Sequence, residues 1–244
     1  MVTEIRPGHG TDELCWTRWP EPAGWPRLHV AGLGPRVVVL AAHPDDEVLG
    51  AGGLVAALVT SGADLVVVWA TDGEASHAGS TAVPAEHLAA VRRAESASAL
   101  ALLGAGAAPR RHLALPDGGL ADREPDLVEA LRAVVRPGDT VVAPWSGDGH
   151  PDHEACGRAA RAVAPHVLEY PVWMWHWARP GDDRVPWSRA RRLDLDGEAR
   201  ERKAAAVACF ASQLRPLGPA PEDGPVLPPQ VLAHFARDHE VVLA

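Results

Sequence analysis

Two short polar segments contain residue types that bind metal ions and move protons. The first, residues 42–47 (AHPDDE), places His43 and Asp46 three positions apart. Imidazole and carboxylate are zinc ligands, and a catalytic zinc site uses three protein ligands and a water. His43 and Asp46 can reach one ion from a turn that opens a helix, while Asp45 between them can face the water. The alternative is a polar strand-to-helix turn in which Asp45 or Asp46 caps the helix.

The second segment, residues 148–153 (DGHPDH), supplies His150, Asp152 and His153. Taken alone it could also be a solvent-exposed turn. The first segment offers two ligands and lacks a third, which a histidine of the second segment can provide. The two segments together therefore predict one metal site.

The elements that must position these segments follow from hydrophobic patterning. Short apolar runs predict strands, which cover residues 36–42, 64–70, 112–115, 140–143 and 166–172. Helical patterns lie between and after them, at residues 47–60, 84–103, 125–135, 153–163 and 200–212, and residues 239–243 are expected to form an edge strand. Strands that alternate with helices predict an α/β fold with a mostly parallel sheet. Such sheets bind ligands at the carboxyl ends of their strands, where both segments lie.

Composition narrows the classes of protein. The 244 residues are 47% hydrophobic and 23% charged, with a net charge of −9. An acidic chain without a long basic run is a poor candidate for binding nucleic acid. Three distant cysteines do not suggest a disulfide framework. With no signal-like apolar segment at the N-terminus and no run near the roughly 20 residues of a membrane span, a cytoplasmic protein is expected.

The two segments resemble the motifs of the LmbE/PIG-L family of zinc-dependent sugar de-N-acetylases. Further segments are similar to family motifs: residues 71–74 (TDGE), 92–95 (RRAE) followed by 103–104 (LG), 115–118 (LPDG), and 203–206 (KAAA) with 212–213 (SQ). The resemblance covers about residues 36–213. It implies a Rossmann-like three-layer fold and hydrolysis of an N-acetyl group on an amino sugar or sugar conjugate.

The resemblance also implies roles for individual residues. By position, His43, Asp46 and His153 would bind Zn²⁺, and Asp45 would be the general base toward a metal-activated water. His150 would stabilise the oxyanion or protonate the leaving amine. Asp152 would orient His150, and a carboxylate in that place would raise the pKa of the imidazole. Fe²⁺ or Co²⁺ can use the same ligands, so the native metal stays open.

Other polar residues are weaker candidates. Glu74, Arg92 and Asp117 are candidates for binding substrate hydroxyls. Alternatively, Arg92 could pair with an acidic residue of its own helix, and Asp117 could be a turn residue without a role in binding. Cys156, one turn after His153, is expected to be a small buried residue, because catalytic zinc keeps an open position.

Tryptophans are concentrated in one segment. Residues 170–177 (YPVWMWHW) alternate at the strand period, which would place Trp173, Trp175 and Trp177 on one face. They could pack against a sheet or another subunit, or form a hydrophobic wall for an aglycone or acyl chain. Residues 74–84 and 173–197 are expected to line the pocket.

We therefore expect residues 1–34 to form an arm packed on a single LmbE-like domain at 35–244. The expected activity is metal-dependent N-deacetylation of a small-molecule amino-sugar substrate. The alternatives are an amidase of a sugar-linked thiol conjugate, and an inactive carbohydrate-binding protein. Asp45 argues against the inactive protein, because a binding site needs no base. A homo-oligomer is compatible with the sequence, which does not define the oligomeric state.

Overall fold

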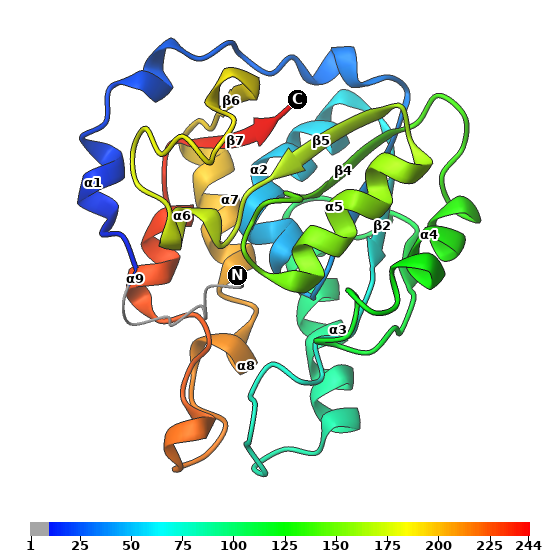
Figure 1. Ribbon diagram of the computed structural model, residues 1–244, viewed down its shortest axis with the longest axis vertical. Helices are drawn as coiled ribbons and strands as arrows, with labels where there is room; N and C mark the ends of the chain where they lie inside the picture. The colour runs from blue at the N-terminus through cyan, green and yellow to red at the C-terminus, as the bar shows by residue number, and fades with distance from the viewer. Residues whose placement is uncertain (1–9) are drawn as a thin grey trace.

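The apolar runs form one central sheet in the computed structural model, which describes residues 10–244 (Figure 1). Within this range the sheet has seven strands in the order β3-β2-β1-β4-β5-β7-β6. The strands are β1 (Arg36–Ala41), β2 (Asp64–Trp69), β3 (Arg110–His112), β4 (Thr140–Pro144), β5 (His166–Tyr170), β6 (Ala190–Asp194) and β7 (His239–Leu243). β1 to β5 pair in parallel, whereas β7 is antiparallel to both neighbours. The expected mostly parallel sheet is confirmed.

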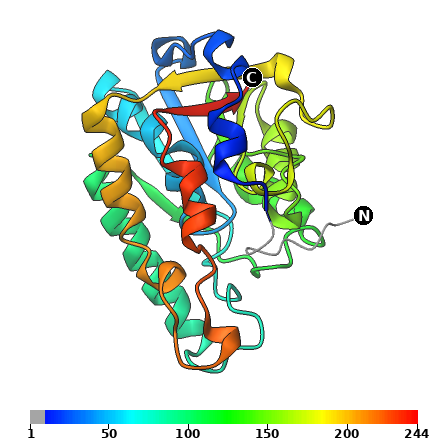
Figure 2. The same cartoon turned by 90° about the vertical axis from the view of Figure 1, so that its left-hand side faces the viewer.

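Helices cover both faces of the sheet (Figures 1 and 2). They are α1 (Glu13–Thr17), α2 (Asp46–Ser61), α3 (Ala85–Leu102), α4 (Glu124–Arg132), α5 (Pro151–Val163), α6 (Met174–Trp177), α7 (Gly197–Val207), α8 (Ala211–Leu214) and α9 (Pro229–Leu232). Alternate residues of β1 belong to different cores: Val38 and Leu40 pack with α4 and α5, and Val37 and Val39 with α2 and α3. The fold is therefore the expected three-layer α/β arrangement.

Residues 10–34 lie against the side of the sheet that carries β6 and β7 (Figure 2). The Trp16 indole donates to the carbonyl of Trp175 at 2.9 Å, and the Glu13 carboxylate accepts hydrogen bonds from Arg237 at 2.6 Å. Trp16, Trp19, Trp25, Trp175 and Trp187 form one aromatic cluster, with ring centroids 4.8 to 6.4 Å apart along its contacts. Residues 1–9 of the expected arm lie outside the described residues.

Several local predictions were wrong. β7 is not an edge strand, because the Arg-rich segment β6 pairs outside it. The alternating tryptophans do not form a strand. Residues 174–177 form the single turn α6, and Trp173 and Trp175 are buried in the core. The expected helix 200–212 is two helices, α7 and α8. The predicted strand 112–115 lies two residues too late, since β3 is Arg110–His112.

Helix α2, which begins at the first polar segment, is broken at Ala51. Ala51 has non-helical dihedral angles, φ −142° and ψ 18°. The Glu240 carboxylate accepts hydrogen bonds from the amides of Gly53 at 2.6 Å and Leu54 at 2.9 Å, and Lys203 Nζ pairs with it at 2.7 Å. A carboxylate thus caps the second half of α2 as it would cap a helix N-terminus. Asp46 and Glu47 thus lie on the part of α2 that precedes the break at Ala51.

Gly157 lets α5 approach the end of β4 closely. A Cβ atom at this position would lie 2.6 Å from Ser146 N and 2.7 Å from the Pro144 carbonyl oxygen, and backbone atoms cannot rotate away. We expect Gly157→Ala to lower the free energy of unfolding by about 3 kcal/mol, measured by urea denaturation. Gly197→Ala is the control because no atom lies within 4 Å of its Cβ, and its effect should stay within about 1 kcal/mol. Equal stabilities of the two variants would contradict the close approach.

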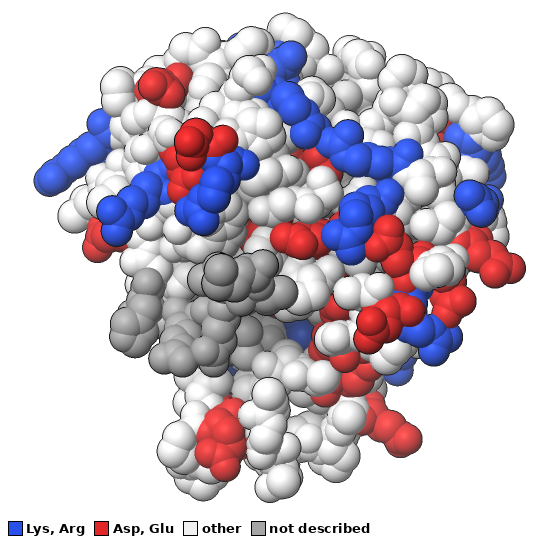
Figure 3. Space-filling model, viewed as in Figure 1, with Lys and Arg blue, Asp and Glu red and all other residues white. Residues whose placement is uncertain are grey.

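Neither the helices of the described residues nor the charge distribution on the face of Figure 3 shows a membrane or polyanion signal. Within residues 10–244, no helix combines the length and apolar character that a bilayer crossing requires. On the face shown in Figure 3, acidic and basic side chains of the described residues are interspersed. This mixed charge agrees with the sequence argument against a polyanion-binding surface on that face.

Candidate active site

The three predicted metal ligands lie together at the carboxyl end of the sheet. His43 follows β1, Asp46 opens α2, and His153 lies in the first turn of α5. All three are buried, and one ligand atom from each lies within 4.8 Å of the others. His43 Nδ1 is 3.4 Å from one oxygen of Asp46, and His153 Nε2 is 3.2 Å from the other. The fold thus brings together residues that are more than a hundred positions apart.

His153 shows that this cluster fits a metal ion. Its Nδ1 lies 2.8 Å from the Asp148 carboxylate, which fixes a proton on Nδ1 and makes Nε2 the atom that can bind a metal. Nε2 is buried and has no hydrogen-bond partner among the described residues. Burial by itself would lower the pKa of His153, but Asp46 and Asp148 outweigh it and raise the pKa to about 9. The negative surroundings that hold a second proton on the ring also suit a divalent cation, which would replace that proton on Nε2.

Asp45 lies beside the metal cluster in a strained backbone conformation. Its φ is 134° and its ψ −30°, a conformation that costs a residue other than glycine about 1–3 kcal/mol. Its carboxylate accepts a hydrogen bond from Arg92 at 3.0 Å. Burial raises the pKa of Asp45 to about 7, and Arg92 opposes this rise. A carboxylate with a pKa near neutrality is well matched to general base catalysis.

His150 and Asp152 reach the site, but their interactions differ from the expected ones. The Asp152 carboxylate accepts hydrogen bonds from the amides of Gly118 and Leu120 and lies 3.3 Å from His43 Nε2. It is the Asp152 backbone N–H that donates to His150 Nδ1, at 3.2 Å. Burial, together with His153 and His43, lowers the pKa of His150 to about 3, opposite to the expected direction. The sequence could not show this, because the partners of Asp152 come from a distant turn.

The three expected substrate-binding residues also lie around the cluster. Asp117 Oδ1 is 3.0 Å from His43 Nε2, and the Asp117 amide donates to Glu74 at 3.0 Å. Arg92 is only 2% exposed and donates to Asp45 and to the carbonyls of Gly73 and Pro44. None of these three partners belongs to its own helix, α3, and the side chain is not exposed to solvent. Arg92 therefore holds Asp45, and contact of Arg92, Glu74 and Asp117 with substrate stays a prediction.

Two acidic residues of the same motifs had no role assigned from the sequence. Asp148 is fully buried and accepts hydrogen bonds from His153 and from the amides of residues 172–174, each at 2.8 to 2.9 Å. Glu47 is fully buried and accepts a hydrogen bond from the Asp45 amide at 3.1 Å. Burial raises the pKa of Glu47 to about 8. Asp148 could have been found by asking which carboxylate orients the ligand His153.

We expect Asp148→Asn to weaken metal binding about 10- to 100-fold, because the amide cannot serve all four donors as acceptor. The affinity is measured by competition with a chromogenic chelator. Asp183→Asn is the control, since Asp183 is exposed on the loop after α6. Wild-type affinity in Asp148→Asn would mean that Asp148 holds only residues 172–174.

One of the tryptophans in residues 170–177 lies at the site. The half-buried Trp177 indole donates to the Asp148 carbonyl at 2.7 Å, next to the turn that carries His150. Trp175, in contrast, is buried in the aromatic cluster with Trp16. The segment thus packs into the core through Trp175 and contacts the turn of the second motif through Trp177.

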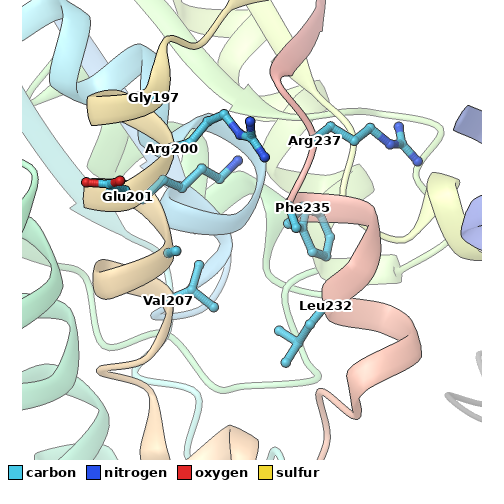
Figure 4. Close-up of a pocket in the computed structure, with 10 residues that line it drawn as sticks. Gly197, Arg200, Glu201, Val207, Leu232, Phe235 and Arg237 are labelled. Carbon is cyan, nitrogen blue, oxygen red and sulfur yellow. The ribbon is translucent and has the colours of Figure 1, made fainter.

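A separate cavity of about 490 Å³ lies between α7 and the segment that carries α9 (Figure 4). Its lining residues are Gly197, Arg200, Glu201, Lys203, Ala204, Val207, Leu232, Phe235, Ala236 and Arg237. No predicted catalytic, metal-binding or substrate-binding residue lines it, so this cavity is distinct from the metal cluster.

Comparison with known proteins gives a family match. Residues 38–164 match the sequence model of the PIG-L family, described as GlcNAc-PI de-N-acetylase. A 1D-myo-inositol 2-acetamido-2-deoxy-alpha-D-glucopyranoside deacetylase of Rhodococcus erythropolis is 32% identical over 208 residues, covering 74% of this chain and 68% of that protein. An enzyme of the same name, numbered 1, from Saccharopolyspora erythraea is 34% identical over 171 residues, covering 55% of this chain and 56% of that protein.

Similarity to solved structures extends to the fold. The N,N'-diacetylchitobiose deacetylase of Pyrococcus horikoshii superposes with a TM-score of 0.56 at 22% identity, covering 83% of this chain and 76% of that one. At this level of identity the likeness concerns the α/β architecture. The chain spans about two thirds of the length of the first curated relative and little more than half of the second.

Proposed function

The chain belongs to the PIG-L family, and from this premise we propose that it is a metal-dependent hydrolase that removes the N-acetyl group of an amino sugar or sugar conjugate. The observation that carries the proposal is the buried cluster of His43, Asp46 and His153 with Asp45 beside it. Zinc is the metal we propose, with Fe²⁺ or Co²⁺ as alternatives for the same ligands.

His43, Asp46 and His153 would hold the metal ion. When bound, such an ion polarises the amide carbonyl and lowers the pKa of water. Asp45 takes a proton from the attacking water and, with a pKa near 7, can return it to the leaving nitrogen. Arg92 supports this cycle by holding one oxygen of Asp45. Asp45 is thus our candidate for both general base and general acid.

His150 is suited to stabilise negative charge as a neutral imidazole. Its Nδ1 accepts a hydrogen bond from the Asp152 amide, so the ring proton lies on Nε2. An Nε2–H in a buried site can donate to the oxyanion that forms when water adds to the amide. The low pKa of His150 favours this role over protonation of the amine.

The proposed substrate is a small amino-sugar conjugate of the kind named for the Rhodococcus relative. Glu74 is half-buried, the side chain of Asp117 is 7% exposed, and both carboxylates lie beside the cluster as our candidates for contact with sugar hydroxyls. We place the pocket wall at residues 74–84 and around Trp177.

The test is acetate release from N-acetylglucosamine, N-acetylglucosaminyl inositol and N-acetylglucosaminides with large apolar aglycones, with zinc-loaded and chelator-stripped protein. Metal-dependent release from any of them supports the proposal. A metal-bound protein without release would overturn it. An amide-linked sugar–thiol conjugate in the same panel distinguishes the amidase, and binding without turnover distinguishes the inactive carbohydrate-binding protein.

A further inference from the structure

We propose that Glu47 is a positioning residue that keeps the backbone of Asp45 in its strained conformation. The inference rests on the proposed function, in which Asp45 transfers the proton. Neither the family match nor the motif comparison assigns Glu47 a role.

The backbone at Asp45 is unusual in a way that needs support. Among the described residues other than glycine, only Asp45 and Ala114 have positive φ, and Asp45 has the larger value, 134°. Side chains with a Cβ atom are disfavoured there by steric contact with the backbone. Such a conformation persists only when surrounding contacts impose it. The contacts of Asp45 must therefore explain its geometry.

Three groups of Asp45 are each held by a different partner. Its carbonyl oxygen accepts hydrogen bonds from the amides of Val48 and Leu49 at 3.0 and 2.9 Å, which form the first turn of α2. Its carboxylate accepts from Arg92 at 3.0 Å. Its amide donates to Glu47 Oε2 at 3.1 Å. The angle φ describes rotation between the amide and Cα, so Glu47 is the contact that opposes relaxation of φ.

The surroundings of Glu47 agree with this role. Its side chain is fully buried, so water cannot replace it as the acceptor for the Asp45 amide. It belongs to neither group of potential metal ligands found among the described residues. A rotation of φ would swing the Asp45 carboxylate relative to His43 and Asp46, the residues on either side of the same turn. Glu47 therefore acts on proton transfer through the orientation of Asp45.

The test compares two substitutions of similar size. Glu47→Gln keeps a side-chain oxygen that can accept the Asp45 amide, whereas Glu47→Met fills the same space without a good acceptor. We expect Glu47→Gln to retain most of the wild-type kcat. Glu47→Met should lose about 10²-fold in kcat, since small misplacements of a catalytic group have effects of this size. KM and metal stoichiometry should stay at wild-type values in both variants.

Three results would overturn the inference: wild-type kcat in Glu47→Met, an equal loss in both variants, or loss of the metal from Glu47→Met. If Glu47→Met does not fold, Glu47→Ala replaces it, because it removes the acceptor without adding bulk.

A second readout does not depend on catalysis. Crystal structures of the variants should show positive φ at Asp45 in Glu47→Gln and a relaxed, negative φ in Glu47→Met. An unchanged φ in Glu47→Met would refute the inference even if the substrate is unknown. Wild-type protein that releases no acetate, with φ relaxed in Glu47→Met, would instead refute the proposed function alone.

Discussion

Asp45→Asn should lower kcat by about 10²–10⁴-fold, the usual contribution of a general base. The asparagine amide has the same shape and can still accept from Arg92, but it cannot take a proton from water. Metal stoichiometry should remain one ion per chain, because His43, Asp46 and His153 are untouched. Steady-state acetate release and metal analysis of the same preparation measure both quantities.

The same substitution should change the pH dependence. Asp45 acts as a base only when it is ionised, so wild-type kcat/KM should fall as the pH drops through its pKa. That acid limb should lie at or below pH 7, since the pKa is about 7 without a cation and a bound cation favours the carboxylate. The limb should disappear in Asp45→Asn. Asp122→Asn, at an exposed position after β3, is the control for the chemical change.

Two outcomes would contradict the assignment of Asp45. Turnover of Asp45→Asn close to that of the wild type would remove Asp45 from proton transfer. Loss of the metal would instead place Asp45 among the ligands.

The second large effect is expected for His153→Ala, which should abolish tight metal binding and activity together. His153 supplies the buried Nε2 that has no hydrogen-bond partner among the described residues. Zinc at 100 times its Kd should stabilise the wild type by about 2.7 kcal/mol through linkage, and the variant should show almost none of this gain. Thermal denaturation with and without zinc, together with metal analysis, measures the difference.

His87→Ala is the matched control, because His87 is exposed on α3 and outside the cluster. It should bind zinc and unfold as the wild type does. Full zinc stoichiometry in His153→Ala would show that another residue is the third ligand.

The family match covers the proposed metal site but not all of the chain. The relatives named above act on N-acetylated sugars, and the His-Asp-His cluster of this chain lies on elements within the matched range 38–164. The segments outside that range, residues 10–34 and the chain after α5, supply the tryptophan cluster, the Glu240 cap of α2 and the contact of Trp177 with Asp148.

The sequence by itself determined the parallel part of the sheet and singled out the residues that we propose as metal ligands and base. Apolar β-branched runs such as Val37–Val39 predict buried strands because a strand covered on both faces needs no polar alternation. The two HPD segments follow such runs, and parallel strands bring their carboxyl ends to one edge. These local patterns point to His43, Asp46 and a histidine of the second segment, and the family resemblance implies that this histidine is His153.

Only the tertiary structure decided which groups each side chain contacts. Arg92 lies 47 positions from Asp45, and nothing local distinguishes that pairing from one within its own helix. The Asp152 carboxylate accepts hydrogen bonds from the turn at 118–120 instead of from His150. Burial of His150, together with His153 and His43, lowers the pKa that a carboxylate partner would raise. The tryptophans alternate as in a strand, but core packing determined their structure, and residues 174–177 form a helical turn. Local periodicity determines the elements of this fold, whereas long-range contacts and burial set the protonation and orientation of its site.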